Sequence, residues 1–283
     1  MFYSGISDEA AKDLDSQIRA HKELGWNHIE MRNVDGVQFH DLDDQAFDRA
    51  AEQLAAAGLR VSCFASAIAN WARKITMPFE DDMAILRRAI PRMRRLGTPF
   101  IRVMSYPNDD LADDAWRDEA VRRLSEMARA AADAGVTLVL ENCDGWASQS
   151  PAHFSRFVEL VGSPALKVVY DLGNPAAKGY ANSWDWYLAA KPHIAYIHVK
   201  ACSALGKMSY PDEGAESRVA EVFADLFASG YDGGFSIEPH LAAVIHAGKT
   251  VEDAAGEAYR IYVEYGRRTV RMVEAARAAA GKG

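Results

Sequence analysis

The chain repeats one pattern of apolar and polar positions six times. In each repeat, a stretch rich in alanine, leucine, arginine or glutamate ends near a glycine, and a short apolar run of strand-forming residues follows. Glycine tolerates the left-handed backbone that ends many helices, and an unbroken apolar run is typical of a strand buried on both faces of a parallel sheet. The pattern predicts six helix–strand units. They are HKELGWNHIEM, AAAGLRVSCF, RRLGTPFIRVM, ADAGVTLVLEN, ELVGSPALKVVYD and FASGYDGGFSIE.

Two further apolar runs, FYSGIS and KPHIAYIHV, raise the number of expected strands to eight. The expected strands cover about residues 2–6, 27–32, 60–66, 100–105, 136–142, 167–171, 194–200 and 234–238. The expected helices cover roughly residues 8–24, 42–57, 79–96, 113–134, 151–161, 183–190, 215–229 and 251–280. Ser150 and Pro151 are the residue types expected at an N-cap and at the first helical position. Eight alternations predict a single (β/α)8 TIM-barrel domain over residues 1–283, with a doubly wound sheet as the alternative.

Composition narrows the range of partners. The 283 residues include 32 basic and 40 acidic side chains, a net charge of −8, and the basic residues are spread along the helical stretches. Binding to a nucleic-acid backbone needs a concentrated basic surface, so no nucleic-acid partner is expected. The three cysteines show no CxxC spacing, and the sequence contains neither a signal-peptide pattern nor an apolar run of about 18 residues. We therefore expect a cytoplasmic protein without a membrane partner.

Four expected strands end on residues that commonly bind metals. Glu141, Asp171, His198 and Glu238 lie at the ends of the last four strands. In a parallel barrel the carboxyl ends of the strands form the active site, and alternation allows each of these side chains to point inward. Taken singly, each could instead be a cap, a turn residue or an ion-pair partner. Taken together, they predict one metal site.

The donor types indicate which metal would bind. Three carboxylates crowded at a barrel mouth would repel one another, and a divalent cation removes that cost. Three oxygen ligands and one imidazole suit Mn²⁺, Mg²⁺ or Co²⁺ better than a thiolate-rich zinc site, and Mn²⁺ is favoured among them. The sequence therefore predicts a single divalent cofactor ion.

These strand ends also carry a family resemblance. The segments LENCDG, VVYDLGNP, YIHVKA and FSIEPH, with GISDE, HIEMR and YPDEGAES elsewhere, resemble the xylose-isomerase-like TIM barrels. More narrowly, they resemble the sugar phosphate isomerase/epimerase group, which includes ketose 3-epimerases, inosose dehydratases and lyases acting on 3-keto-glycosides. The resemblance covers nearly the whole chain. It implies a dimer or tetramer that acts on a small sugar or cyclitol.

The resemblance also implies roles for individual residues. Glu141, Asp171, His198 and Glu238 would hold the metal, and the two glutamates would form the acid–base pair that removes and returns a proton beside a carbonyl. Two positions depart from the ketose epimerases: Asn174 stands where they have a histidine, and Ala204 where they have an arginine. Both family residues grip substrate oxygens, so the departures leave room for a lyase or dehydratase that begins with the same proton abstraction.

Four further residues are candidates for substrate binding. Lys200 shares the face of His198, His240 follows Glu238 by two positions, and Asn174 follows a predicted ligand. Trp146 lies in a segment after a strand and could stack on a sugar ring. Each residue also has a purely structural alternative. Lys200 and His240 could be surface residues or partners of a nearby acid, Asn174 could orient a ligand, and Trp146 could simply pack in the core.

One more acidic residue is interpreted differently. Glu30 lies inside an expected strand and has no counterpart among the sequential ligand positions, so it is expected to support the site through an internal ion pair. The leading function is a metal-dependent sugar isomerase or epimerase. The alternatives are a lyase or dehydratase, a non-catalytic metal- or sugar-binding protein and, least favoured, an endonuclease, which would need further metal ligands and a basic groove.

Overall fold

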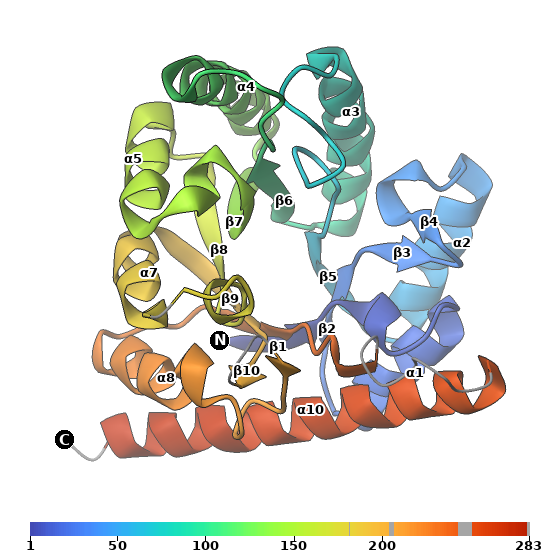
Figure 1. The fold of residues 1–283 in the computed structure, drawn as a ribbon. Coiled ribbons are helices and arrows are strands. Elements are labelled where there is room, and N and C mark those ends of the chain that lie inside the picture. The colour runs from blue at the N-terminus through green and yellow to red at the C-terminus, as the bar shows by residue number, and fades with distance from the viewer. Residues whose placement is uncertain (181, 204–206, 243–250, 282–283) are drawn as a thin grey trace.

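Eight parallel strands form one ring in the computed structural model (Figure 1). The structure describes residues 1–180, 182–203, 207–242 and 251–281, the side chains of 251–254 excepted. The strands are β1 (Phe2–Gly5), β2 (His28–Met31), β5 (Arg60–Phe64), β6 (Phe100–Ser105), β7 (Thr137–Gly145), β8 (Leu166–Asp171), β9 (Ile194–Val199) and β12 (Gly234–Ile237). Their order in the sheet is β1-β12-β9-β8-β7-β6-β5-β2, and a parallel bridge between Ile6 and Glu30 joins the two end strands. The predicted TIM barrel is confirmed.

Helices surround this ring, and α10 runs along one side of it against α8 and α1 (Figure 1). The helices are α1 (Leu14–Glu23), α2 (Asp44–Ala56), α3 (Phe79–Leu96), α4 (Asp113–Ala134), α5 (Pro151–Val161), α6 (Asn174–Ala177), α7 (Ser183–Ala190), α8 (Val219–Ala228) and α10 (Val251–Ala280). Left-handed glycines end α3, α4 and α5, and the Ser150 hydroxyl caps α5 by accepting from the His153 amide. Among the described residues, no helix is both long and apolar enough to cross a bilayer.

Two predicted helices begin later than expected. The helix expected over 8–24 is divided: a 3₁₀ turn covers Ser7–Glu9, and α1 starts only after Asp13, whose carboxylate accepts from the Ser16 amide at 2.8 Å. The helix expected over 215–229 is interrupted by Arg218, which has φ +51°, so that α8 begins at residue 219. In both cases a local cap or a left-handed residue overrides the helical composition.

Two short hairpins were not predicted. β3 (Asn33–Val34) pairs with β4 (Val37–Gln38) after the second barrel strand, and β10 (Cys202–Ser203) pairs with β11 (Lys207–Met208) after the strand that carries His198. Two-residue strands are too short to show an alternating pattern. Both hairpins follow the carboxyl ends of barrel strands, where the predicted ligands also lie.

The barrel interior contains a small apolar layer of its own. Cys63, Val139, Val169 and Tyr196 pack together inside the ring and are fully buried. The last three precede the predicted ligands Glu141, Asp171 and His198 by two residues each. Because side chains alternate along a strand, these pairs share the inward face, so the apolar layer lies directly below the predicted ligands.

A glycine fixes the approach of β6 and β7. Gly145 has φ +91° and ψ −169°, and a Cβ atom there would lie 2.2 Å from the backbone carbonyl carbon of Ser105. Gly135 also has a positive φ, of +71°, but a Cβ atom there would meet nothing within 4 Å. A side chain at Gly145 would therefore meet both backbone strain and steric overlap, whereas one at Gly135 would meet backbone strain alone.

We expect Gly145→Ala to lower the free energy of unfolding by about 3 kcal/mol, because strain and overlap add. Gly135→Ala should cost only about 1 kcal/mol, since strain acts alone. Urea unfolding followed by circular dichroism measures both. Equal losses for the two variants would contradict the close approach at Gly145.

Candidate metal centre

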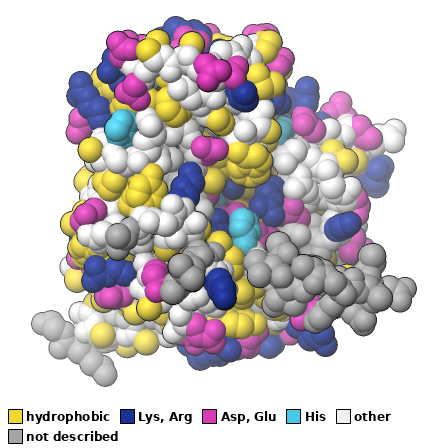
Figure 2. Space-filling model, viewed as in Figure 1, with side chains coloured by type: hydrophobic (Ala, Val, Ile, Leu, Met, Phe, Trp, Pro, Cys, Tyr) yellow, Lys and Arg dark blue, Asp and Glu magenta, His cyan; other side chains and the backbone are white. Residues whose placement is uncertain are grey.

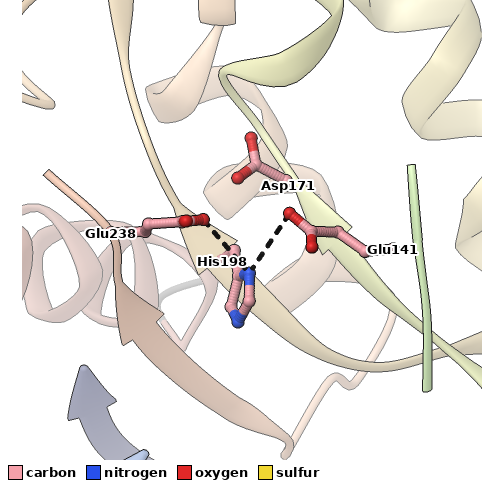
Figure 3. Close-up of side chains that lie close together, drawn as sticks. All are labelled: Glu141, Asp171, His198 and Glu238. Atoms are coloured by element: carbon pink, nitrogen blue, oxygen red, sulfur yellow. Dashed lines mark ion pairs between the residues drawn. The ribbon is translucent and has the colours of Figure 1, made fainter. Parts of the chain in front are cut away.

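The structure brings the four predicted metal ligands together at the barrel mouth (Figure 3). Glu141 lies in β7, Asp171 ends β8, His198 lies in β9 and Glu238 directly follows β12. One potential ligand atom from each residue lies within 4.8 Å of the other three, and each residue is at most 3% exposed. Four residues far apart in the sequence thus form a single buried cluster.

Each of the four side chains also has a buried atom without a hydrogen-bond partner. These atoms are Glu141 Oε2, Asp171 Oδ2, His198 Nδ1 and Glu238 Oε2. Basic side chains lie within ion-pair distance of the three oxygens, but none of the four atoms has a hydrogen-bond partner, so the cluster keeps donor atoms available for a further group. Three carboxylates and one imidazole could hold one divalent cation, and the donor set fits Mn²⁺, Mg²⁺ or Co²⁺.

Two buried basic residues form ion pairs with the carboxylates. Arg102 Nη1 lies 3.1 Å from Glu141 Oε2, while Lys200 Nζ lies 2.9 Å from Asp171 Oδ2 and 3.1 Å from Glu238 Oε2. Arg102 and Lys200 are each 3% exposed. Lys200, expected at the rim or the surface, is therefore an internal residue of this cluster.

The buried charges do not cancel. Besides the three acidic predicted ligands, Glu30 contributes a fourth buried carboxylate. In the part of the chain that the structure describes, Arg102 and Lys200 are the buried permanent cations that lie beside these four acids. Two negative charges remain when His198 is neutral. One divalent cation would balance them, which is a second reason why this donor set fits such an ion.

The same neighbours shift the pKa values of the carboxylates. Burial alone would favour the neutral acid at Glu141, but the Arg102 charge and the nearby His198 lower its pKa to about 2. At Glu238 burial is likewise outweighed, chiefly by the Lys200 charge, and the pKa falls well below its usual value. At Asp171 burial prevails over the Lys200 charge and raises the pKa to about 6.

Backbone and amide groups hold Asp171 in place. Its Oδ1 accepts from the amides of Gly173 and Asn174 at 2.8 and 2.7 Å. Asn142 bonds the Asp171 main chain on both sides, accepting from its N–H at 2.7 Å and donating to its carbonyl at 2.9 Å. Only Oδ2 of this carboxylate is left to face the cluster.

Asn174 connects Lys200 with Glu141. The lysine ammonium donates to Asn174 Oδ1 at 3.1 Å, and Asn174 Nδ2 donates to Glu141 Oε1, also at 3.1 Å. The predicted substrate-binding residues Lys200 and Asn174 are thus brought to the cluster. Ala204, the other position that departs from the ketose epimerases, lies outside the described residues.

His240 reaches the cluster from its outer side. Its Nε2 lies 3.1 Å from Glu238 Oε1 and 3.0 Å from Glu9 Oε1, and its side chain is 39% exposed. Burial and the Lys200 charge oppose protonation, but Glu238 and Glu9 raise the pKa of His240 to about 9. Figure 2 shows acidic and basic side chains and a histidine near the middle of this face of the molecule.

Two acidic residues that follow β1 were not among the predicted site residues. Asp8 accepts from Arg32 Nε at 2.9 and 3.1 Å, and Glu9 Oε2 accepts from the His240 amide at 2.8 Å. Arg32 in turn lies 3.6 Å from Glu238 Oε1. The signal was present in the sequence, because GISDE places both acids just after the first strand.

A family comparison agrees with this architecture. The sequence profile of the xylose isomerase-like TIM barrel family matches residues 18–262. The chain belongs to this family. No curated protein sequence matches the chain.

Solved structures of xylose isomerase-like barrels share the fold across nearly the whole chain. A Mycobacterium smegmatis xylose isomerase-like TIM barrel protein in complex with magnesium is 19% identical, with TM-score 0.71, covering 98% of this chain and 97% of that one. The D-allulose 3-epimerase from Methylomonas sp. in complex with D-allulose is 18% identical, with TM-score 0.61, and the match covers 94% of this chain and 97% of that one. The probable 3-DHS dehydratase AsbF from Bacillus anthracis is 16% identical, with TM-score 0.68, and the match covers 92% of this chain and 98% of that one.

One predicted site residue of this xylose isomerase-like barrel lies elsewhere. Trp146 is only 4% exposed, its ring packs against His153 at 4.5 Å, and its Nε1 donates to Asp113 Oδ1 at 3.0 Å. These contacts place the indole in the hydrophobic core between α4 and α5. Trp146 is therefore a packed core residue, as in the structural alternative, and does not line the cluster.

We expect Lys200→Met to lower the free energy of unfolding by about 3 kcal/mol in the presence of EDTA, because it leaves two buried carboxylates without their cation. Lys191→Met is a matched control. Lys191 pairs with Asp225 while both side chains are about one-third exposed, so its loss should cost under about 1 kcal/mol. Urea unfolding of both variants gives the comparison. Similar costs would show that Lys200 does not stabilise the cluster.

Proposed function

We propose that this chain is a divalent-metal-dependent isomerase or epimerase that acts on a keto-sugar or cyclitol by removing a proton from the carbon next to a carbonyl. The observation that carries the proposal is the convergence of Glu141, Asp171, His198 and Glu238 within 4.8 Å at the carboxyl ends of the strands. These four residues would hold the ion, with Mn²⁺ favoured and Mg²⁺ or Co²⁺ as alternatives. When bound, the ion would act as a Lewis acid that polarises the substrate carbonyl.

Glu141 and Glu238 are the proposed acid–base pair. They belong to strands separated in the ring by β8 and β9, so they approach the barrel axis from different sides. Arg102 and Lys200 keep both carboxylates ionised at neutral pH, which is the state that accepts a proton. A positioned carboxylate of this kind contributes typically 10²- to 10⁴-fold to the rate.

Three polar residues around the pair are proposed to bind the substrate. Lys200 and Asn174 can hydrogen-bond substrate oxygens at the inner edge of the cluster, and His240 can do so from its partly exposed position. Lys200 also brings a fixed positive charge, which stabilises negative charge that develops on a substrate oxygen. The Mg²⁺ and D-allulose complexes of the two similar structures are in keeping with this class of ligand.

A lyase or dehydratase is the second candidate. It would share the proton abstraction but expel a group from the next carbon, as in cleavage of a 3-keto-glycoside or dehydration of an inosose. The observation that favours it is the Lys200–Asn174 pair: Asn174 replaces the histidine of the ketose epimerases, and the adjacent Lys200 ammonium can protonate a leaving group. The similarity to a probable dehydratase points the same way.

A substrate panel in D₂O tests both candidates. The protein is treated with EDTA, Mn²⁺ is restored, and ketoses, inososes and 3-keto-glycosides are followed by NMR. A rearranged sugar that carries solvent deuterium supports an isomerase or epimerase, while an unsaturated product or released aglycone supports a lyase. Activity that is unaffected by EDTA, or the absence of near-stoichiometric Mn²⁺ binding, would overturn the proposal.

We expect Glu141→Gln and Glu238→Gln each to lower kcat at least about 100-fold on the substrate so identified, because each removes a proton acceptor. Glu159→Gln serves as the control, since Glu159 is 59% exposed on α5 and should leave kcat unchanged. Steady-state kinetics at saturating Mn²⁺ measures the effect. Unchanged sugar binding by both site variants, with no turnover in the wild type, would instead indicate a non-catalytic binding protein.

A further inference from the structure

Glu30 lies at the centre of a buried hydrogen-bond network beneath the candidate metal centre. Its side chain is fully buried in β2. One oxygen accepts from the Tyr196 hydroxyl at 2.9 Å, and the other accepts from the Ser236 hydroxyl at 2.6 Å. Nε2 of His198 lies 3.1 Å from both oxygens. Residues from three strands, β2, β9 and β12, thus meet at one carboxylate.

We propose that Glu30 is a positioning residue that fixes the tautomer and the ring orientation of His198, so that Nδ1 presents its lone pair to the metal. This inference rests on the proposed function, because it assumes that the four-residue cluster binds a divalent ion. It adds a fifth residue that touches neither the ion nor the substrate but sets how tightly the ion is held.

The hydrogen bonds determine the tautomer. An ionised carboxylate only accepts, so His198 Nε2 must carry the proton that lies between it and Glu30. An imidazole that binds a cation through Nδ1 is neutral and carries its one proton on Nε2, which is the proton that Glu30 holds. Nδ1 has no hydrogen-bond partner and lies 3.5 Å from Glu238 Oε2 and 3.8 Å from Glu141 Oε1. The tautomer set by Glu30 is the one that a cation in this cluster requires.

Packing holds the ring in that orientation. The Tyr196 ring meets the His198 ring edge to face, with centroids 5.4 Å apart and an interplanar angle of 77°. Rotating the imidazole would move Nε2 away from Glu30 and leave a buried carboxylate short of a donor, at a cost of about 1–3 kcal/mol. A histidine whose second nitrogen is held by a carboxylate is also a stronger metal ligand.

Glu30→Gln tests the inference. The amide has nearly the same shape but one acceptor oxygen instead of two and no negative charge. We expect the Kd for Mn²⁺, measured by competition with a fluorescent chelator, to rise about 10- to 100-fold. Ser236→Ala is the matched control: it removes another hydrogen bond to the same carboxylate and leaves the Nε2 contact in place, so its effect should stay below about threefold.

A spectroscopic readout separates positioning from general destabilisation. In the Co²⁺-loaded protein, the His198 Nε2–H should give a paramagnetically shifted proton resonance that is absent in D₂O. The hydrogen bond to Glu30 should slow exchange of this proton, and Glu30→Gln should broaden or abolish the signal. Ser236→Ala should retain it.

The outcomes distinguish the two proposals. If the wild-type protein binds no metal, the proposed function fails. If the wild type binds Mn²⁺ and Glu30→Gln binds it equally well with an unchanged Co²⁺ spectrum, only the role of Glu30 fails. Should Glu30→Gln not fold, Glu30→Asp keeps the charge but shortens the side chain by one methylene; an unchanged Kd in that variant would equally overturn the inference.

Discussion

The burial of four carboxylates at one end of the barrel is the constraint on which the rest of the site depends. Removing a single carboxylate from water is costly, and like charges a few ångströms apart add repulsion. Nearby partners offset this cost: Arg102 pairs with Glu141, Lys200 pairs with both Asp171 and Glu238, and two hydroxyls with an imidazole surround Glu30. These partners lie in β6, in or directly after β9, and in β12, so the sheet must form before they meet the acids.

The parallel barrel suits such a site because it divides its interior into layers. The apolar layer formed by Cys63, Val139, Val169 and Tyr196 lies below the charges and holds the strands at fixed spacing. Tyr196 belongs to both levels, since its ring packs against Phe100 while its hydroxyl reaches the carboxylate network. Rigid apolar packing beneath therefore limits how far the polar groups above can relax.

Much of this architecture could be predicted from local sequence signals. The glycines that end α3, α4 and α5 allowed the bounds of these helices to be predicted to the residue, and strand-end chemistry identified the four residues that converge. What failed depended on contacts across the ring. The burial of Lys200 and the packing of Trp146 follow from barrel closure and register, which no single segment encodes. The supporting ion pair expected of Glu30 is present, but its partner, His198, could be identified only from the structure. The N-cap at Asp13 is a local signal for a helix that starts at residue 14, but the helix-favouring composition of residues 8–13 led to an earlier predicted start.

The bridge between Ile6 and Glu30 gives the seam of the barrel an unexpected importance. The backbone of Glu30 joins the first strand to the second, and its side chain meets His198 on the opposite part of the ring. One residue thus ties the integrity of the seam to the pose of the imidazole. A substitution that weakens the pairing of the N-terminal strand, although far along the chain from the four converging residues, would disturb His198 through Glu30. Cation affinity would then report on closure of the barrel.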